Sequence, residues 1–351
     1  MSQKNHSQDS TGPPGGLSEG QQRFLRDLFP GAQALFGERA RIYGTDAGRQ
    51  HFAPWAVVRP VAADQVEELL RWAQKERVPL FPRGRGTNVV GGCVPRGGGV
   101  VVSTLFLDSI LELDEQDFLA VVQPGVLTAR LQEEAGQCGL IYPPDPASAG
   151  ISSLGGNAAT NAGGMGAVKY GVTRDHVLGC EAVLPGGERI HSGGRVHKDA
   201  VGLDLTSLLV GSEGTLGFIT ELTLRLLPRP EARASLLAGF RDQSQGLLAA
   251  REVFRSGLLP AAMEFMDREA VACLSSYGFT WLRDTGFLLL LTLDGPGSCL
   301  EAELEGIRQV LSGFDPVTLQ FARTPEEESS LWEARRALNP ASFQLGTNKL
   351  S

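Results

Sequence analysis

Three tracts rich in glycine and small polar residues carry the residue types that could hold a large ligand. The first, 82–92, follows a predicted strand and places four glycines around Thr87 and Asn88. Glycine permits positive φ and lets backbone N–H groups face an anion without interference from a Cβ atom. The loop therefore predicts a pyrophosphate cradle, although a glycine-rich surface turn has the same composition. It lacks the third glycine of a dinucleotide-binding fingerprint and the Gly-Lys-Ser/Thr of a P-loop.

The second and third tracts are also rich in glycine, which would let the backbone approach a ligand closely. Tyr142–Ser148 leads into Gly155–Gly164, where four glycines, two asparagines and a threonine fall within ten residues. Such a run cannot pack a conventional core, and it suits the surroundings of a flat, hydrogen-bonding ligand. In the third tract, Leu209–Glu221, glycines alternate with apolar residues before a strand. Glu213 there could bond a ribose hydroxyl or a backbone amide, or be an exposed turn carboxylate.

The elements expected to position these tracts alternate β-rich runs with helices. Asp64–Lys75 predicts the clearest helix, with Asp64 as its cap and Val66, Leu69, Leu70 and Ala73 at helical spacing. A second helix is predicted over 128–138, and strands over 78–81, 100–104, 110–114, 119–123, 177–184 and 218–227. Pro228-Arg229-Pro230 then marks a boundary, after which the pattern of strands and helices differs from that of the first part. Beyond it, strands at 234–240, 262–266 and 286–293 alternate with helices at 243–256 and 299–312.

Composition excludes several classes of protein. Hydrophobic residues make up 42% of the 351 residues and charged residues 21%, which is typical of a soluble globular chain. The net charge of −8 argues against general nucleic-acid binding. Five widely spaced cysteines without a C-x-x-C pair predict free thiols in a reducing compartment, so we expect a cytoplasmic protein. The five histidines show no metal-ligand spacing, and none is persuasive as a general base; His176 is expected to be structural.

In this order and spacing, the three tracts resemble the FAD-binding domain of the vanillyl-alcohol-oxidase (PCMH-type) flavoproteins. Residues 20–345 resemble the catalytic subunit of glycolate oxidase and the related D-lactate and D-2-hydroxyglutarate dehydrogenases. The resemblance implies an α+β fold, with a PCMH-type FAD-binding domain of two α+β subdomains over 20–228. An incomplete α+β cap, or substrate, domain would follow over 229–351, and residues 1–19 are expected to form a disordered tail.

The resemblance also implies the residues that contact FAD. The first tract would wrap the pyrophosphate, the second would line the flavin and ribityl side, and Glu213, Gly217 and Ile219 would complete the adenosine side. The first two sets are Pro82, Arg83, Gly84, Arg85, Gly86, Thr87, Asn88, Gly91 and Gly92, and then Pro144, Asp145, Ser148, Gly155, Gly156, Asn157, Thr160, Asn161 and Gly164. Residues 82–94 contain no histidine, so we expect FAD to be non-covalent and Cys93 to be a buried, inert thiol.

Candidate substrate contacts come from the last helix. Leu331-Trp332-Glu333-Ala334-Arg335-Arg336 resembles the W-x-x-R element whose arginine binds the substrate carboxylate, a role that suits a guanidinium fork. The resemblance assigns this role to Arg335, with Asn339 one turn later and Lys349 as a second cation. On spacing alone, Arg335 and Arg336 would instead form a solvated helix face.

Relatives of this kind continue with histidine-containing motifs that bind a divalent metal and supply the base for the hydroxyl proton. This chain has no histidine after His197, so those ligands and any catalytic base are absent from it. We therefore expect a truncated product, a fragment or one chain of a split enzyme. For the complete enzyme, the resemblance implies hydride transfer from the substrate Cα to flavin N5 and onward transfer of electrons to a quinone or an iron–sulfur subunit.

Three functional hypotheses follow from these observations. The first is an FAD-dependent oxidoreductase that converts a small 2-hydroxy acid, of the glycolate or D-lactate type, to the 2-oxo acid. The second is a non-catalytic or truncated FAD-binding subunit of a multi-subunit oxidase. The third, an oxidase of another alcohol such as a sugar, is disfavoured by a carboxylate-binding arginine.

Overall fold

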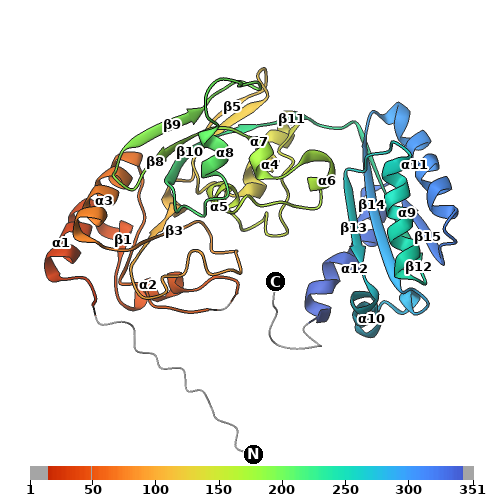
Figure 1. Cartoon of the computed structure of the whole chain (residues 1–351), viewed down its shortest axis with the longest axis horizontal. Coiled ribbons are helices and arrows are strands. Elements are labelled where there is room, and N and C mark those ends of the chain that lie inside the picture. The colour runs from red at the N-terminus through yellow and green to blue at the C-terminus, as the bar shows by residue number, and fades with distance from the viewer. Residues whose placement is uncertain (1–14, 49, 343–351) are drawn as a thin grey trace, which may run out of the picture. The chain divides into compact units, whose positions relative to one another are not determined.

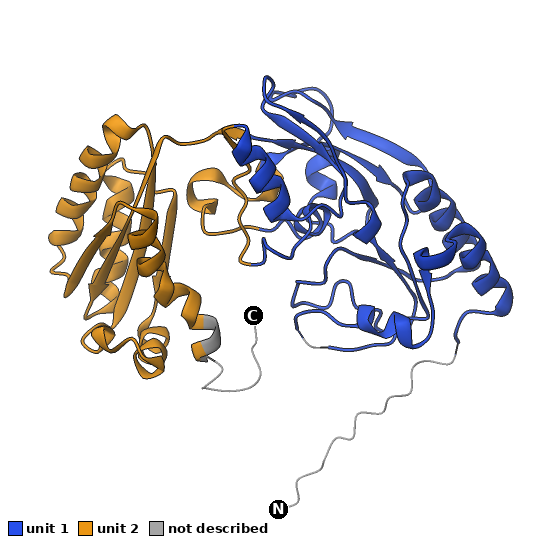
Figure 2. Cartoon of the chain, turned by 180° about the vertical axis from the view of Figure 1, so that it is seen from behind, with its two compact units in different colours: residues 1–138, 148–162, 176–226 blue, residues 139–147, 163–175, 227–351 orange. Residues whose placement is uncertain are grey.

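The computed structural model describes residues 15–48 and 50–342, apart from the side chains of residues 339, 340 and 342. The chain forms two compact units that do not follow a single cut in the sequence (Figures 1 and 2). Unit 1 combines residues 1–138, 148–162 and 176–226, and unit 2 combines 139–147, 163–175 and 227–351. The two short segments, which contain both ends of the second glycine-rich tract, therefore belong to the unit that the C-terminal part of the chain builds.

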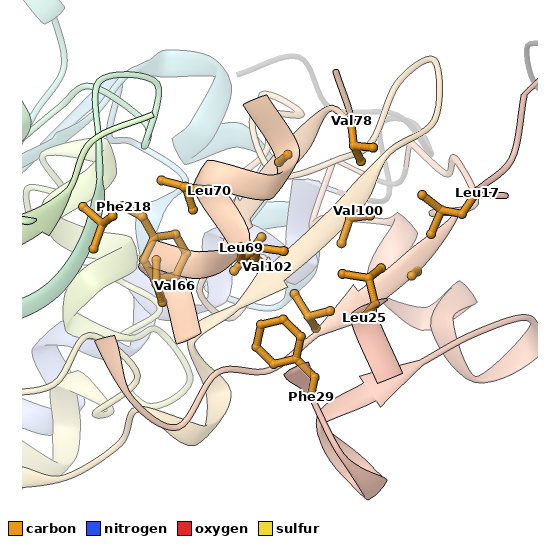
Figure 3. Close-up of a cluster of buried hydrophobic side chains, with 14 of the residues drawn as sticks. Leu17, Leu25, Phe29, Val66, Leu69, Leu70, Val78, Val100, Val102 and Phe218 are labelled. Atoms are coloured by element: carbon orange, nitrogen blue, oxygen red, sulfur yellow. The ribbon is translucent and has the colours of Figure 1, made fainter. Parts of the chain in front are cut away.

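Unit 1 begins with a four-stranded sheet in the order β1-β2-β4-β3, in which β2, β4 and β3 are parallel and β1 pairs antiparallel with β2. Helices α1 and α3 pack on one face through the apolar cluster shown in Figure 3. The elements are β1 (Ala34–Leu35), β2 (Ala56–Val58), β3 (Leu80–Arg83), β4 (Val100–Ser103), α1 (Glu19–Leu28), α2 (Glu38–Arg41) and α3 (Ala63–Glu76).

Helix α3 forms where the apolar periodicity predicts it, and Val66, Leu69, Leu70 and Ala73 are its buried residues. The predicted cap is wrong. The N-cap position is Ala62, without a side-chain cap, and Asp64 lies inside the first turn, where it pairs with Arg189. An acidic side chain within the first turn of a helix is favourable without being the cap, because it lies near the positive end of the helix dipole.

Ordered structure also starts before the end of the predicted tail. Leu17 is buried in the cluster of Figure 3, and Ser18 caps α1 through a reciprocal hydrogen-bond pair with Gln21. This Ser-x-x-Gln capping box is a recognisable start signal for a helix, and it lies within a polar stretch whose composition alone suggests disorder.

The second sheet of unit 1 is antiparallel, with the order β5-β6-β10-β8-β9. The predicted strands 110–114, 119–123, 177–184 and 218–227 are confirmed within two residues, and β9 is a further strand that was not predicted. The elements are β5 (Ile110–Asp114), β6 (Leu119–Val122), β8 (Val177–Val183), β9 (Arg189–Gly193), β10 (Phe218–Arg225), α4 (Thr128–Gln137), α5 (Leu154–Thr160), α7 (Thr173–His176, at the unit boundary) and α8 (Leu205–Leu209).

Unit 2 is built on an antiparallel sheet with the order β13-β14-β12-β15, and the predicted alternation of strands and helices beyond residue 230 is confirmed. A short pair, β7 (Leu140–Ile141) with β11 (Leu227–Pro228), joins the early segment to the C-terminal part. The remaining elements are α6 (Ala167–Tyr170), β12 (Ala232–Phe240), α9 (Gln243–Arg255), β13 (Ala262–Met266), α10 (Arg268–Tyr277), β14 (Phe287–Gly295), α11 (Gly297–Ser312), β15 (Thr318–Ala322) and α12 (Pro325–Ser342).

Both faces of this sheet are buried, which explains the nearly continuous apolar run of β14. Leu289 and Leu291 face a cluster that includes α9 and α11, while Leu288 and Leu290 face a second cluster that includes α10 and α12. Side chains alternate across a strand, so an uninterrupted leucine run fills both layers at once. The predicted α+β fold class is confirmed.

Candidate functional site

The first tract forms the loop that follows β3. A buried arginine and a buried aspartate fix this loop through hydrogen bonds inside unit 1. The Arg83 guanidinium donates through Nη1 to the Thr45 carbonyl oxygen at 2.6 Å and to Cys93 Sγ at 3.1 Å. Asp46 accepts from the Gly48 and Gly91 amides, each at 2.8 Å. Arg83 was predicted to wrap the pyrophosphate, but its side chain is occupied with these internal bonds.

The contribution of Asp46 was missed by sequence reasoning. Its signal in the sequence is the Asp-Ala-Gly turn, in which the carboxylate bonds a backbone amide two residues on. Ala47 extends this brace, because its N–H is directed at the carbonyl oxygens of Gly86 and Asn88, at 3.1 and 3.0 Å. These carbonyls therefore point into the protein, and the loop is fixed on that side.

A run of backbone donors in the same loop has no partner within the described chain. The backbone N–H groups of residues 85–88 donate to no other residue that the structure describes, and Arg85 Nε is buried without a partner there. A buried donor without a partner is rare in folded proteins, so Arg85 Nε indicates an acceptor that is supplied from outside the chain. An anion with several oxygens, such as a pyrophosphate, meets that requirement.

The second tract forms a short helix, α5, that touches the first loop. Ser153 caps α5 by accepting from the Gly156 amide at 3.3 Å. A Cβ atom at Gly84 would lie 2.5 Å from Ser153 Oγ and 3.3 Å from the Gly156 Cα atom. The two backbones therefore approach as closely as they do because Gly84 and Gly156 have no side chains.

The interpretation that this tract cannot pack into a core is wrong for α5. Leu154, Gly155, Asn157 and Ala158 are buried, and Gly155 fits closely against Pro124. Glycine is a poor helix former, so residue preferences alone did not predict this helix. Asn157 was predicted to line the flavin. Its side chain is instead buried and donates to Thr128 Oγ1 at 2.7 Å, which anchors α5 to α4.

The third tract completes the assembly by bonding the far end of α5. The Gly211 and Glu213 amides donate to the carbonyl oxygens of Ala158 and Ala159, both at 2.8 Å. Gly214, at φ +75°, packs against Pro82, and a Cβ atom there would lie 2.7 Å from the Pro82 ring. The exposed Glu213 carboxylate lies beside Gly92. The three tracts, far apart in sequence, therefore meet in unit 1.

A largely apolar pocket of about 300 Å³ adjoins this meeting point in unit 1. It is bounded by α3, the strands β3 and β4, and the third tract. Its volume is at the lower end of the range for small-molecule sites. Of the predicted cofactor residues, Pro82 and Gly217 line it, while Ile219 is buried in β10. The lining is completed by Leu70, Ala73, Gln74, Val78, Leu80, Val102, Pro185, Gly214, Thr215 and Phe218.

The predicted flavin-side residues are divided between the units. Ser148, Thr160 and Asn161 belong to unit 1 with α5, whereas Pro144, Asp145 and Gly164 belong to unit 2. Within unit 2, Gly164 lies so close to the Asp145 backbone that a Cβ atom would clash with it. The resemblance did not indicate this division, because contiguous sequence suggests a single structural unit.

A buried aspartate fastens the 163–175 segment to the sheet of unit 2. Asp294 on β14 accepts from Tyr170 Oη at 2.7 Å and pairs with Lys169 Nζ, which also donates to the Asp294 carbonyl oxygen at 2.8 Å. Only 6% of the Asp294 side chain is exposed. Burial, and next the hydrogen bond to Asp294, raises the pKa of Tyr170, so the phenol remains a donor at neutral pH.

Asp294→Ala is expected to lower the melting temperature of unit 2 by about 5–10 °C, because it leaves a largely buried lysine without its partner. Differential scanning calorimetry measures the change. Glu305→Ala is the control, since it removes an exposed ion pair with Arg308 and should shift melting by about 1 °C or less. Equal shifts in the two variants would contradict the anchoring role of Asp294.

Of the predicted substrate residues, the structure describes the side chain of Arg335 alone. Arg335 lies on α12, and its Nε donates to Glu264 Oε2 at 2.8 Å. Asn339 is on the same helix with its side chain outside the described set, and Lys349 lies outside the described residues. Arg336 does not share this partner, because its Nη2 donates to Ser329 of the same helix. The expected shared solvated face is therefore wrong for this pair, since Arg335 pairs with a strand residue.

The remaining candidates behave as structural groups. All five cysteines are free, and burial raises the pKa of the Cys93 thiol, which is consistent with an inert group. His176 is buried at the end of α7. Among residues 15–48 and 50–342, no three His, Cys, Asp or Glu side chains gather as a metal-binding group. Within the same ranges, the helices are all too short or too polar to cross a bilayer.

Comparison with protein families supports a cofactor assignment for the first two tracts. A family model described as an FAD binding domain matches residues 54–193. A second model, described as the C-terminal domain of FAD linked oxidases, matches residues 229–350. The first range includes the first two tracts, and the second includes Glu264 and Arg335.

Curated relatives have related activities. Glycolate oxidase subunit GlcD of Bacillus subtilis is 40% identical over 87% of this chain and 65% of its own length. D-lactate dehydrogenase of Anaerostipes hadrus is 36% identical over 81% of this chain and 62% of its own length. D-2-hydroxyglutarate dehydrogenase of Stutzerimonas stutzeri is 40% identical, with 88% and 68% covered. The chain thus spans about two thirds of the length of these relatives.

Solved structures agree on the fold. An alkyldihydroxyacetonephosphate synthase superposes with a TM-score of 0.77 at 22% identity, over 95% of this chain and 65% of that protein. p-Cresol methylhydroxylase with bound substrate superposes with a TM-score of 0.76 at 16% identity, over 96% of this chain and 71% of that protein. At these identities the likeness establishes a shared PCMH-type architecture and leaves the substrate open.

Proposed function

The chain belongs to the FAD-linked oxidases, and from this premise we propose that it binds FAD non-covalently and takes part in oxidising a small 2-hydroxy acid to the 2-oxo acid. The observation that carries the cofactor assignment is the meeting of the three tracts in unit 1. Open backbone donors at 85–88, an unpartnered Arg85 Nε and the Gly84–Gly156 approach together fit a pyrophosphate-containing ligand.

The residues of the chain would divide the work of binding FAD. The amides of residues 85–88 would bond the pyrophosphate. The apolar pocket beside Gly214 and Gly217 would take the adenine ring, since a flat heteroaromatic ring suits a slot lined mostly by aliphatic side chains. The predicted residues of the second tract that belong to unit 1 would line the flavin and ribityl side: Ser148, Gly155, Gly156, Thr160 and Asn161. FAD supplies the hydride acceptor when bound.

The substrate class is proposed from Arg335 and from the relatives. An arginine with free Nη groups binds a carboxylate through two parallel hydrogen bonds. Three relatives are named for glycolate, D-lactate and D-2-hydroxyglutarate, which share a carboxylate next to a hydroxyl-bearing carbon. Arg335 would clamp that carboxylate and orient the Cα–H bond. Asn339 and Lys349 remain predicted further contacts, and a divalent metal remains an expectation from the resemblance.

Anaerobic titration tests this function. The purified chain reconstituted with FAD is mixed with glycolate, D-lactate or D-2-hydroxyglutarate, and the flavin absorbance is followed. We expect slow bleaching by at least one of them, because solvent must take the hydroxyl proton that a catalytic base would otherwise accept. FAD binding without bleaching by any 2-hydroxy acid would contradict catalysis by this chain and favour a cofactor-binding subunit. Because the Bacillus subtilis relative is named as a glycolate oxidase subunit, we extend the proposal to electron transfer to a quinone or an iron–sulfur partner.

Filling the apolar pocket is expected to weaken FAD binding. Thr215 is exposed and lines the pocket, so Thr215→Trp places an indole where the adenine ring is proposed to bind. We expect the Kd for FAD to rise about 10-fold, the effect of losing roughly 1.4 kcal/mol of contacts. Quenching of flavin fluorescence measures the Kd. Leu208→Trp, at an exposed leucine that is not part of the pocket lining, is the matched control and should leave the Kd unchanged.

A further inference from the structure

Glu264 occupies a position on β13 where an apolar residue is expected. Ala262 and Met266, two residues to either side, are buried in the cluster that α10 and α12 cover. Side chains two apart share a face of a strand, so Glu264 points toward the same helices. A carboxylate at a core-facing position costs free energy unless it is paired, and here the partner is Arg335.

The ion pair itself contributes little to stability. The Arg335 and Glu264 side chains are 36% and 25% exposed, and pairs with this much exposure are weak because water screens them. A valine or leucine at position 264 would extend the apolar face at no electrostatic cost. The carboxylate is therefore better explained by what it does to Arg335 than by what it adds to the fold.

The geometry of the pair leaves one edge of the guanidinium open. Glu264 takes the Nε–H at 2.8 Å, and the Nη1 and Nη2 groups of Arg335 donate to no residue in the described part of the chain. A guanidinium is rigid and planar, so fixing Nε also fixes the direction in which the two Nη groups point. With Nε bonded to Glu264, the Nη1/Nη2 edge is the edge that remains for two parallel bonds to a second carboxylate.

We propose that Glu264 is a positioning residue: it holds Arg335 by Nε so that the Nη edge is presented to the substrate carboxylate. This inference rests on the proposed function, in which Arg335 is the carboxylate clamp. It explains why a glutamate occupies position 264 on β13. It also means that the orientation of the Arg335 guanidinium depends on the sheet of unit 2 as well as on α12.

Two variants separate positioning from simple charge effects. Glu264→Gln keeps an amide oxygen that can accept from Nε but removes the charge. Glu264→Ala removes the acceptor as well. Positioning predicts that the alanine variant weakens binding of a 2-hydroxy acid about 10-fold, while the glutamine variant binds as well as the wild type or more tightly. If Glu264 acted only by opposing the substrate charge, both variants would bind more tightly; if it were merely structural, neither would change.

Binding is measured on the full FAD-loaded chain by calorimetric titration of glycolate, D-lactate and D-2-hydroxyglutarate. A second readout needs no substrate: the NMR signal of the Arg335 Nε–H, assigned by its loss in Arg335→Lys. We expect this proton to be protected from water exchange in the wild type and in Glu264→Gln, and unprotected in Glu264→Ala.

The two readouts distinguish the ways in which the idea can fail. An unprotected Nε–H in the wild type, with substrate binding intact, would overturn the role of Glu264 while leaving the proposed function standing. A protected Nε–H in a chain that binds no 2-hydroxy acid would overturn the proposed function and, with it, the substrate that Arg335 is positioned to receive. Equal binding changes in the glutamine and alanine variants would also overturn the positioning role.

Discussion

Gly84→Val is expected to yield a folded chain that retains essentially no FAD after desalting. Even a Cβ atom at this position would lie 2.5 Å from Ser153 Oγ and 3.3 Å from the Gly156 Cα atom, and valine adds two more methyl groups. The loop 82–92 and α5 must then separate. The amides of residues 85–88 would move away from the place where the pyrophosphate is proposed to bind, and Ser153 would lose its cap on α5.

The magnitude follows from how sharply anion binding depends on geometry. Hydrogen bonds to a charged group contribute about 1.5–3 kcal/mol each, and losing two of them weakens binding by at least about 100-fold. The flavin absorbance of the desalted protein and a Kd from fluorescence quenching measure the loss. Circular dichroism establishes that the variant is folded.

Gly150→Val is the matched control, because it makes the same change in the loop just before α5. No atom lies within 4 Å of a Cβ atom built at Gly150, and its φ is not positive. This variant should keep its FAD. Retention of FAD by Gly84→Val would show that the first two tracts do not form the cofactor site together.

Arg335→Ala is expected to raise the KM, or the Kd, for a 2-hydroxy acid by about 100-fold and to leave FAD binding unchanged. The estimate corresponds to the loss of two charge-assisted hydrogen bonds that together contribute about 2.8 kcal/mol. Arg335→Lys should recover only part of the affinity, since an ammonium group does not reproduce the planar fork. Steady-state kinetics or calorimetric titration measures the change.

Arg336→Ala provides the control for this prediction. Arg336 is the adjacent arginine of the same helix, and its Nη2 is bonded to Ser329 and not directed toward β13. Removing it changes the net charge by the same amount as Arg335→Ala. If both variants lost affinity equally, the effect would be general electrostatic attraction and Arg335 would not be the clamp.

Much of the fold could be predicted because its signals are local. The spacing of Val66, Leu69, Leu70 and Ala73 defines the buried side of α3, and strands such as 110–114 and 262–266 were predicted with their bounds. Apolar periodicity reports which face of an element is buried, and this depends only on nearby residues. The resemblance to FAD-linked oxidases, which rested on three tracts in order, is confirmed by both family models.

The errors occurred where distant contacts override local preference. Helix α5 contains two glycines and a threonine, yet it forms because Ser153 caps it and Gly155 fits against Pro124. Asp64 was a reasonable cap by type, but it is committed to Arg189, 125 residues away. Neither partner can be identified from the sequence near the element concerned.

By itself, the sequence predicted glycine loops for a pyrophosphate. The family resemblance added an arginine for a carboxylate and, because the first loop has no histidine, a non-covalent flavin. The tertiary structure decided which atoms are available for it. Arg83 and Asn157 have the right types for ligand contact, but Arg83 Nη1 and Asn157 Nδ2 are bonded inside the protein. The amides of residues 85–88 and the Nη edge of Arg335 have no partner in the described part of the chain. Availability depends on partners that only folding brings together, such as Thr45, Thr128 and Glu264.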